Sequence, residues 1–211
     1  MSNEGYHLSR FAHDPRRKAL WQALAKYFFQ KDIRPDDTVL DLGAGYGEFI
    51  NSVRARRRIA VDIWPGMLDY LDQGVEGIVG RISELDSLED GSIDYVFSSN
   101  CFEHVAREEL MKCLAVLQRK MKAGAMLSVV QPNFKYCYRQ YFDDYTHVGV
   151  YTEVGLADLL TSAGFQVVRR MGKFLPLTMK GRWPVHPALV RLYLMCPFKP
   201  LAGQMLIQAR R

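Results

Sequence analysis

The stretch Asp41-Leu42-Gly43-Ala44-Gly45-Tyr46-Gly47 constrains the fold of this chain of 211 residues more than any other. It closes an apolar run, residues 39–42, that predicts a buried β-strand. Glycine is favoured where the backbone needs a positive φ or must lie against a ligand without an intervening Cβ. A helix-compatible segment then resumes, and we expect this helix to end at the basic cluster of residues 54–58. Strand, glycine turn and helix predict the start of a βαβ unit with a nucleotide-sized site above the strand end.

The residues around the glycines indicate which nucleotide fits. A dinucleotide site has the spacing G-x-G-x-x-G and seats a pyrophosphate on the helix N-terminus. Here the pattern is G-x-G-x-G, and Asp41 precedes it. A carboxylate at that place would repel a pyrophosphate but attract an ammonium group. Asp62 ends the next apolar run, about twenty residues further on, where a ribose-binding acid is expected. The two acids favour a ligand with an amino-acid end and a nucleoside end over NAD, or over a turn that binds nothing.

The pattern D-x-G-x-G-x-G with a following acid resembles motifs I and II of the class I S-adenosylmethionine-dependent methyltransferases. A second block, formed by Leu85, residues 90–96 and Glu103-His104-Val105, resembles the middle of the type 11 group of these enzymes. The resemblance covers residues 36–170. It implies an α/β, Rossmann-like, doubly wound fold with a mostly parallel seven-stranded sheet and helices on both faces. It also implies S-adenosylmethionine as the cofactor, released as S-adenosylhomocysteine.

The resemblance assigns a cofactor site to the chain. The glycine turn would pass close to the methionine part, Asp41 would lie near its amino group, and Asp62 would take the ribose hydroxyls. Ile63 and Trp64 would cover the adenine. The expected cofactor-binding residues are Asp41, Gly43, Ala44, Gly45, Tyr46, Gly47, Asp62, Ile63, Trp64, Arg81, Ile82 and Asn100.

Arg81 departs from the family pattern, which usually has an aspartate there to accept a hydrogen bond from the adenine amino group. The backbone N–H of Ile82 could still serve the ring, and Arg81 could stack on it. The departure keeps open a second hypothesis, a non-catalytic S-adenosylmethionine-binding or scaffold protein.

Residues 134–150 combine aromatic, acidic and basic side chains at a density unusual for a connection. Asp144 and His147 would share a face if that turn were helical. A histidine oriented by a carboxylate can act as a general base, so His147 is the first choice for a catalytic residue and His104 the second. A metal site of Asp143, Asp144 and His147 is an alternative, but further ligands nearby in the sequence are lacking, and we expect none. A hydrogen-bonded loop is the remaining interpretation.

The chain reads as a single domain. Residues 14–30 form an N-terminal helix, residues 36–171 the cofactor-binding core, residues 172–203 an insert, and residues 204–210 the last strand. Basic residues alternate with apolar ones in residues 173–200. This insert is expected to cap the crevice or contact a second copy of the chain, or to touch a membrane surface peripherally. Together with the Tyr-Phe-Asp-Asp-Tyr-Thr-His segment, it loosely resembles methyltransferases of polysaccharide and glycolipid assembly.

The charge and motif content of the chain limit the kinds of partner molecule that we expect. The net charge of +5 is compatible with anionic partners, but the N/D-P-P-Y/F motif of nucleobase methyltransferases is missing after the fourth strand. Nucleic acid is therefore not the expected substrate. RNA-directed methylation is kept as a further alternative, ranked below the others. A small hydroxylated or glycan-type acceptor is expected instead. Four cysteines without metal spacing and the lack of an apolar signal core predict a cytoplasmic protein, with the inner face of the membrane as a second place.

Overall fold

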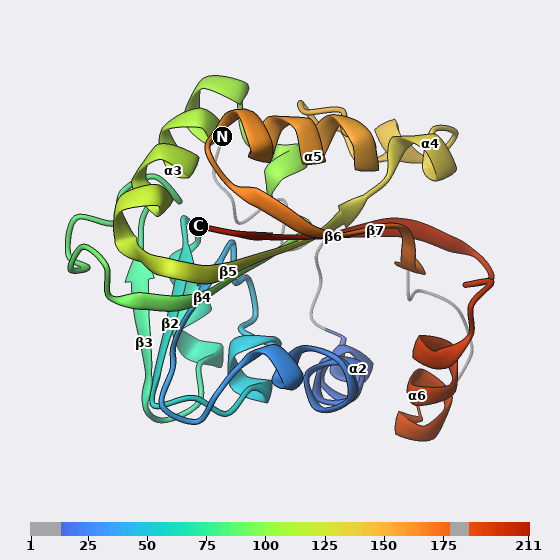
Figure 1. Cartoon of the computed structure of the whole chain (residues 1–211). Coiled ribbons are helices and arrows are strands. Elements are labelled where there is room, and N and C mark those ends of the chain that lie inside the picture. Colours follow the sequence, from blue (N-terminus) through green and yellow to red (C-terminus); the bar gives the residue numbers. More distant parts are fainter. Residues whose placement is uncertain (1–13, 178–185) are drawn as a thin grey trace.

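A computed structural model describes residues 14–177 and 186–211 (Figure 1). Seven strands form one sheet in the order β3-β2-β1-β4-β5-β7-β6. All neighbouring strands are parallel except β7, which runs antiparallel to both β5 and β6. The predicted α/β, Rossmann-like class is confirmed, with a sheet that is mixed at one edge. The strands are β1 (Thr38–Leu42), β2 (Arg57–Asp62), β3 (Val75–Val79), β4 (Ile93–Ser99), β5 (Met121–Pro132), β6 (Gln166–Pro176) and β7 (Ala202–Arg210).

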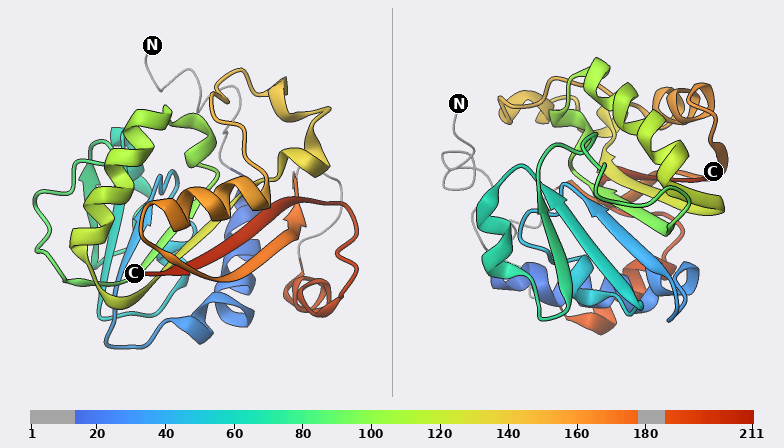
Figure 2. Two further views of the ribbon diagram at one scale, coloured as in Figure 1. Left: turned by 45° about the horizontal axis from the view of Figure 1, so that its top comes forward. Right: turned by 90° about the vertical axis from the view of Figure 1, so that its left-hand side faces the viewer.

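Helices cover both faces of this sheet, as predicted (Figure 2). On one side lie α3 (Arg107–Lys120) and α5 (Glu153–Ser162), and on the other α2 (Pro15–Tyr27) and α6 (Pro187–Met195). A shorter helix, α4 (Phe134–Cys137), follows β5. Local sequence fixes where the longer helices begin: Asp14 accepts a hydrogen bond from the N–H of Arg16, and Thr152 accepts one from the N–H of Gly155. None of the helices in the described ranges is long and apolar enough to cross a membrane.

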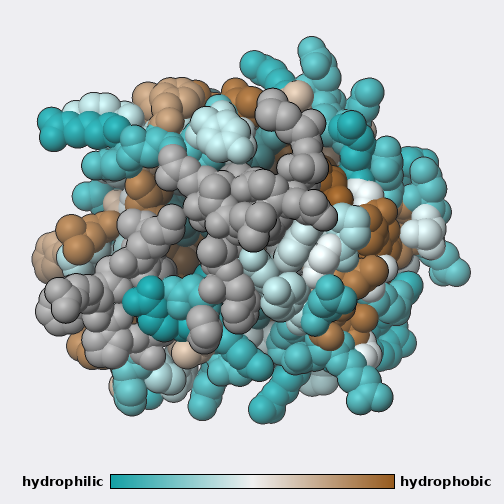
Figure 3. Space-filling model, turned by 180° about the vertical axis from the view of Figure 1, so that it is seen from behind, coloured by the Kyte–Doolittle hydropathy of each residue, from teal (hydrophilic) through white to brown (hydrophobic). Residues whose placement is uncertain are grey.

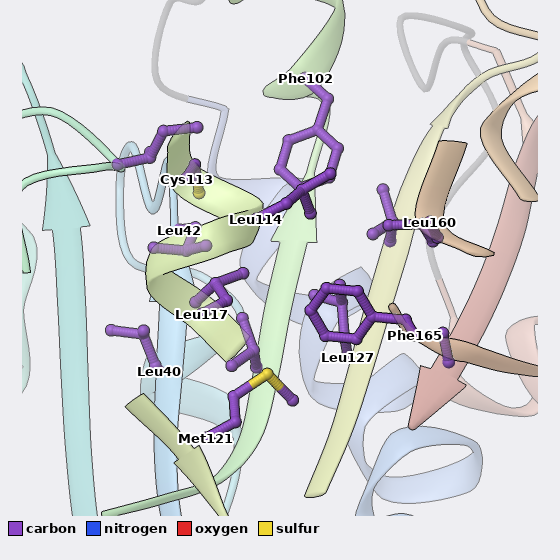
Figure 4. Packing of buried hydrophobic residues seen from close by; sticks show 14 of the residues in the cluster. Leu40, Leu42, Phe102, Cys113, Leu114, Leu117, Met121, Leu127, Leu160 and Phe165 are labelled. Atoms are coloured by element: carbon purple, nitrogen blue, oxygen red, sulfur yellow. The ribbon is translucent and has the colours of Figure 1, made fainter. Parts of the chain in front are cut away.

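Two apolar cores lie on either side of the sheet. The first packs α3 and α5 against the central strands, and many of its side chains are fully buried (Figure 4). The second joins α2 to the opposite face and is rich in aromatic rings. Phe49 and Phe97 stack there with ring centroids 3.7 Å apart, and Trp21 meets Phe97 edge-on at 5.5 Å. The central strand β1, buried along its whole length, lies between the two cores.

The prediction of a helix after the glycine turn is wrong. Between Gly47 and Arg57, a stretch that the structure describes in full, the helical element is one 3₁₀ turn, Ile50–Ser52. A helix rises only about 1.5 Å per residue, so about ten helical residues would be needed to run back along a five-residue strand. The nine residues available are too few. The chain instead returns through turns and a short irregular segment, residues 53–56, and Arg57 and Arg58 of the basic cluster belong to β2.

The segment before the last strand is shorter than the predicted 172–203, because β6 continues to Pro176 and β7 begins at Ala202. Its helix α6 packs against α2, with Val190 buried between them. Residues 178–185 of the predicted insert lie outside the described residues. Within those that are described, the insert forms a helical cap on the α2 side of the sheet (Figure 2).

Candidate active site

The glycine turn after β1 has the geometry that its sequence predicts. Gly43, Gly45 and Gly47 all have positive φ, 70°, 53° and 66°. At Gly43 a Cβ would lie 2.6 Å from the Cys101 Sγ, so glycine is also required for space. The N–H groups of Gly43 and Ala44 both donate to the Val61 carbonyl, at 2.8 and 3.1 Å. The turn is thus clamped between the ends of β2 and β4.

Asp62 holds the turn from the side of β2. One carboxylate oxygen accepts from the Gly45 N–H at 2.8 Å, and the other accepts from the Trp64 N–H at 2.9 Å. A carboxylate held by two backbone donors has a fixed orientation. The sequence placed Asp62 at a ribose, and the structure puts it at the carboxyl end of β2, beside the glycine turn.

Asp41 is buried in β1 with only 3% of its surface exposed. Burial, and then the neighbouring charges of Glu48 and Asp62, raise the pKa of the Asp41 carboxyl well above its usual range, against a hydrogen bond from the Ile50 backbone. Glu48 is paired with Arg17 of α2 at 2.7 Å. The surroundings of Asp41 are therefore negative, and a ligand ammonium group would relieve the repulsion.

Three aromatic rings stand beside the turn. Tyr46 contacts Trp64 edge-on at 5.1 Å and Tyr70 at 4.7 Å, and Trp64 and Tyr70 are 5.8 Å apart. Ile63, at the end of β2, is 52% exposed. The sequence pointed to Tyr46, Ile63 and Trp64 but missed Tyr70, which lies on a 3₁₀ helix, Pro65–Tyr70, with no motif of its own.

The two residues expected at the adenine after β3 differ in their surroundings. Arg81 is exposed, and its guanidinium lies 3.9 Å from carboxylates of both Glu84 and Glu109. Glu109 belongs to α3, so the Arg81 side chain reaches across to that helix. The Ile82 side chain is buried in the first core, which leaves its backbone for a ligand.

Asn100 follows β4 with a φ of +48°, rare for a residue with a side chain. Its N–H donates to the Val130 carbonyl at 2.8 Å, and its side-chain oxygen accepts from Gln204 of β7 at 3.1 Å. A strained backbone at a strand end commonly marks a functional site. Gln204 was not predicted, because it lies 104 residues away in the sequence.

The predicted catalytic histidines come together. The rings of His104 and His147 lie 4.8 Å apart and are tilted by 53°. The His147 Nδ1 lies 2.6 Å from the Tyr141 carbonyl. A carbonyl only accepts, so this nitrogen carries a proton and donates it, which leaves Nε2 of a neutral ring with a lone pair. His147 is therefore oriented by a backbone carbonyl.

Asp144 acts on His104 through a hydroxyl. Thr146 Oγ1 donates to the Asp144 carboxylate at 2.6 Å and lies 2.9 Å from the His104 Nδ1. The hydroxyl has one hydrogen, so the His104 Nδ1 is the donor in the second bond. The prediction that Asp144 and His147 face one another on a helical turn is not met: the 3₁₀ helix Tyr141–Asp143 ends before them, and the carboxylate turns to Thr146.

Protonation of these groups follows from their surroundings. Burial, and then the neighbouring His147, lower the pKa of His104 to about 4, so it is neutral at pH 7. Burial raises the pKa of the Asp144 carboxyl, but hydrogen bonds from Thr146 outweigh this and lower the pKa overall. Asp144 is then a carboxylate beside a neutral imidazole, which gives the chain carboxylate–hydroxyl–imidazole a defined direction.

Glu103, which the sequence offered only as part of a family motif, lies directly beside this pair. It is fully buried, and both carboxyl oxygens are without a hydrogen-bond partner among the described residues. Burial, and then the charge of Asp144, raise the pKa of Glu103 to about 8, against the electrostatic effect of its own backbone. One ligand atom each of Glu103, His104 and His147 lie within 4.8 Å of one another.

Comparison with known proteins indicates the class of protein that this chain resembles. Residues 40–129 match the model of the methyltransferase domain family. The chain is 36% identical over 97 residues to an uncharacterized methyltransferase-like protein of Schizosaccharomyces pombe, a match over 44% of the chain. The chain spans only 37% of the length of that relative.

Solved structures agree on the fold. A methyltransferase from Archaeoglobus fulgidus has a TM-score of 0.70 at 22% identity, and the match covers 100% of both chains. A Haloferax volcanii methyltransferase, solved in complex with the Trm112 methyltransferase activator, has a TM-score of 0.69 at 16% identity over 99% of this chain and 95% of its own. Residues 40–129 are therefore similar to the methyltransferase domain family, and the fold of the chain is that of solved S-adenosylmethionine-dependent methyltransferases. The predicted class and cofactor are confirmed.

Proposed function

We propose that this chain transfers the methyl group of S-adenosylmethionine to an oxygen of a small hydroxylated acceptor of the sugar or glycolipid type. One observation carries the proposal. The segment of residues 100–104 touches the glycine turn at one end and supplies His104, packed against His147, at the other. A donor site and a proton-accepting site thus meet on one short segment.

For the donor, the proposal assigns Asp62 to the ribose hydroxyls and the buried Asp41 to the ammonium group. The fixed carboxylate of Asp62 and the negative surroundings of Asp41 support these roles. Asn100 and the glycine turn would flank the methionine part, and Tyr46, Ile63 and Trp64 the adenine. Exposed Arg81 and the Ile82 backbone would complete the adenine side.

For the acceptor, the proposal assigns proton removal to the pair His104 and His147, with Asp144 as a positioning residue. Methyl transfer is an in-line displacement, in which the acceptor oxygen forms a bond to carbon while the carbon–sulfur bond breaks. The electron pair of the carbon–sulfur bond stays on sulfur, and the proton of the acceptor hydroxyl must leave. An imidazole with a lone pair on Nε2 can receive it.

A non-catalytic S-adenosylmethionine-binding protein is the second candidate, and Arg81 is the observation that favours it. A replaced adenine contact is compatible with a weakened donor site. RNA-directed methylation has weaker support: only the net charge of +5 points to a nucleic-acid surface. The complex with an activator protein known for the Haloferax volcanii methyltransferase is a reason to test protein partners as well.

The outer face of the insert is proposed as a contact surface, with a membrane or a second copy of the chain as its partner. Its apolar side chains are well exposed: Leu189, Leu192, Met195, Phe198 and Leu201. Seen from behind, the coloured part of the surface carries apolar groups in separate patches among polar ones (Figure 3). Scattered patches suit a peripheral contact better than a large permanent interface.

Calorimetric titration with S-adenosylmethionine tests the donor site. Asp62→Ala is expected to weaken binding about 100-fold, because it removes a carboxylate that both binds the ribose and fixes the turn. Asp69→Ala is the matched control, since Asp69 is an exposed carboxylate on the neighbouring 3₁₀ helix. Release of S-adenosylhomocysteine in a screen of hydroxylated acceptors then separates the enzyme from the binding protein. Donor binding with no turnover on any acceptor would favour the second candidate.

A further inference from the structure

Among the described residues, two buried side chains, Glu103 and Gln131, have polar atoms without a hydrogen-bond partner, and only Glu103 carries a carboxyl group. It has no exposed surface and no hydrogen-bond donor among the described residues. Burying a carboxyl group without partners costs free energy, and such groups are rare in folded proteins. Its backbone does not account for the cost, because the Glu103 carbonyl is used separately, accepting from Val148 and Gly149 at 2.8 and 2.9 Å. A positively charged partner would offset this cost by stabilising the carboxylate form.

Two histidines stand where they could share that partner with Glu103. One ligand atom from each of the three residues lies within 4.8 Å of the others. Ligands of a single zinc-sized ion are about 3–4 Å apart, since each bond is about 2.1 Å long. Small rotations of the side chains would therefore close the site. We propose that Glu103, His104 and His147 bind one divalent transition-metal ion.

The hydrogen bonds behind the histidines are those of metal ligands. A metal-binding imidazole usually donates its second N–H to a carbonyl or a carboxylate, which fixes the ring and its tautomer. His147 donates from Nδ1 to the Tyr141 carbonyl. His104 donates from Nδ1 to Thr146, whose hydroxyl passes the interaction to Asp144. Both rings thus have Nε2 as the ligand nitrogen.

The ligand set narrows the choice of ion. Two imidazoles and one carboxylate suit Zn²⁺, Mn²⁺, Fe²⁺ or Co²⁺ better than Ca²⁺, which prefers oxygen ligands alone. Three protein ligands also leave coordination positions open, as in catalytic metal sites. Asp144, one hydroxyl away, adds a second negative charge near the ion.

This inference rests on the proposed function and gives it a more specific chemistry. An acceptor hydroxyl placed in an open coordination position would lose its proton more easily, because the ion lowers its pKa. The proton leaves to water, the oxygen lone pair forms the bond to the methyl carbon, and the carbon–sulfur electrons stay on sulfur. The ion is neither oxidised nor reduced. With the ion bound, His104 and His147 would promote proton removal as ligands of the ion, in place of accepting the proton directly on Nε2.

The test uses the full chain, dialysed against a chelator and titrated with Co²⁺. The visible absorption bands of Co²⁺ report nitrogen ligands and the coordination number. One ion per chain is expected, with Glu103→Gln and His147→Ala each weakening binding about 100-fold or more. His186→Ala controls for exposed histidines, since His186 lies at the start of α6, and it should leave binding unchanged. Circular dichroism confirms that each variant is folded.

Two results would overturn the inference: wild-type protein that binds no Co²⁺, or Glu103→Gln and His147→Ala proteins, both folded, that bind it as tightly as wild type. S-adenosylmethionine titrations of the same samples separate the two proposals. Donor binding without ion binding rejects the metal site alone, and the proposed function stands. Ion binding without donor binding rejects the proposed function and retains the ion site.

Discussion

Substituting Gly43 measures how much the packing of the glycine turn against Cys101 contributes to the free energy of unfolding. Gly43→Ala places a Cβ 2.6 Å from the Cys101 Sγ and 2.7 Å from its Cβ, and it does so at a φ of +70°. The left-handed conformation costs an alanine about 1–2 kcal/mol. Crowding against a side chain that is itself held at a strand end adds about 1–3 kcal/mol. The expected loss in the free energy of unfolding is the sum, about 2–5 kcal/mol.

Gly91→Ala is the matched control. Gly91 has a similar φ of +63°, but nothing lies within 4 Å of the position that its Cβ would take. This variant should lose only the backbone part, about 1–2 kcal/mol. The difference between the two variants isolates the contact with Cys101. Urea denaturation followed by the fluorescence of Trp21 and Trp64 gives both values, with an extra shift of roughly 0.5–1 M in the midpoint for Gly43→Ala.

A double variant completes the cycle. Cys101→Gly removes both crowding atoms, so it should recover most of the extra loss when combined with Gly43→Ala. Equal losses in Gly43→Ala and Gly91→Ala would refute the reasoning, since they would mean that the turn moves away from Cys101 at no cost. The same conclusion would follow if Cys101→Gly gave no recovery.

Three other substitutions test the charges. Asp41→Asn should stabilise the ligand-free protein at neutral pH. Burial raises the pKa of Asp41 in the folded state, so the unfolded state ionises first, and the free energy of unfolding falls as the pH rises above 3.8, the ordinary pKa of an aspartate. Urea midpoints from pH 4 to 8 check this, and a wild-type advantage at pH 7 would contradict it. Lys120→Met should lose about 1–3 kcal/mol, because the buried ammonium of Lys120 donates to the Leu88 carbonyl at 2.6 Å. Asp90→Asn should lose less stability than Lys120→Met in the same assay, because the Asp90 carboxylate is 60% exposed and solvent screens its ion pair; equal losses would argue against this ranking.

The sequence was sufficient for the strands and most of the longer helices. Apolar runs set off by turns marked β1, β2 and β4, and N-capping residues marked α2 and α5. The prediction of a helix after the glycine turn failed because the periodicity of apolar residues says nothing about the distance that a connection must span. At that place the face of the sheet is covered by aromatic rings of the second core.

The candidate site was predictable where a motif is local. Asp41, the glycines and Asp62 could be found because strand ends fix them within about twenty residues. Glu103 and Gln204 could not be recognised as site residues, since their partners come from distant parts of the chain. The pairing expected between Asp144 and His147 failed for a related reason: three-residue spacing aligns side chains only on a continuing helix. The chain leaves its helical turn before Asp144.

Residues 100–104 join the proposed donor side of the site to the proposed acceptor side. Asn100 turns the chain out of β4, and Cys101 packs on Gly43. The His104 N–H donates to the Cys101 carbonyl at 3.0 Å, so this histidine is placed by the same short turn. The Glu103 carbonyl in turn binds the backbone that follows His147. A shift of Cys101 away from Gly43 would therefore move both histidines relative to the methyl donor. For this reason the lack of a Cβ at Gly43 bears on the acceptor side of the site as well as on donor binding.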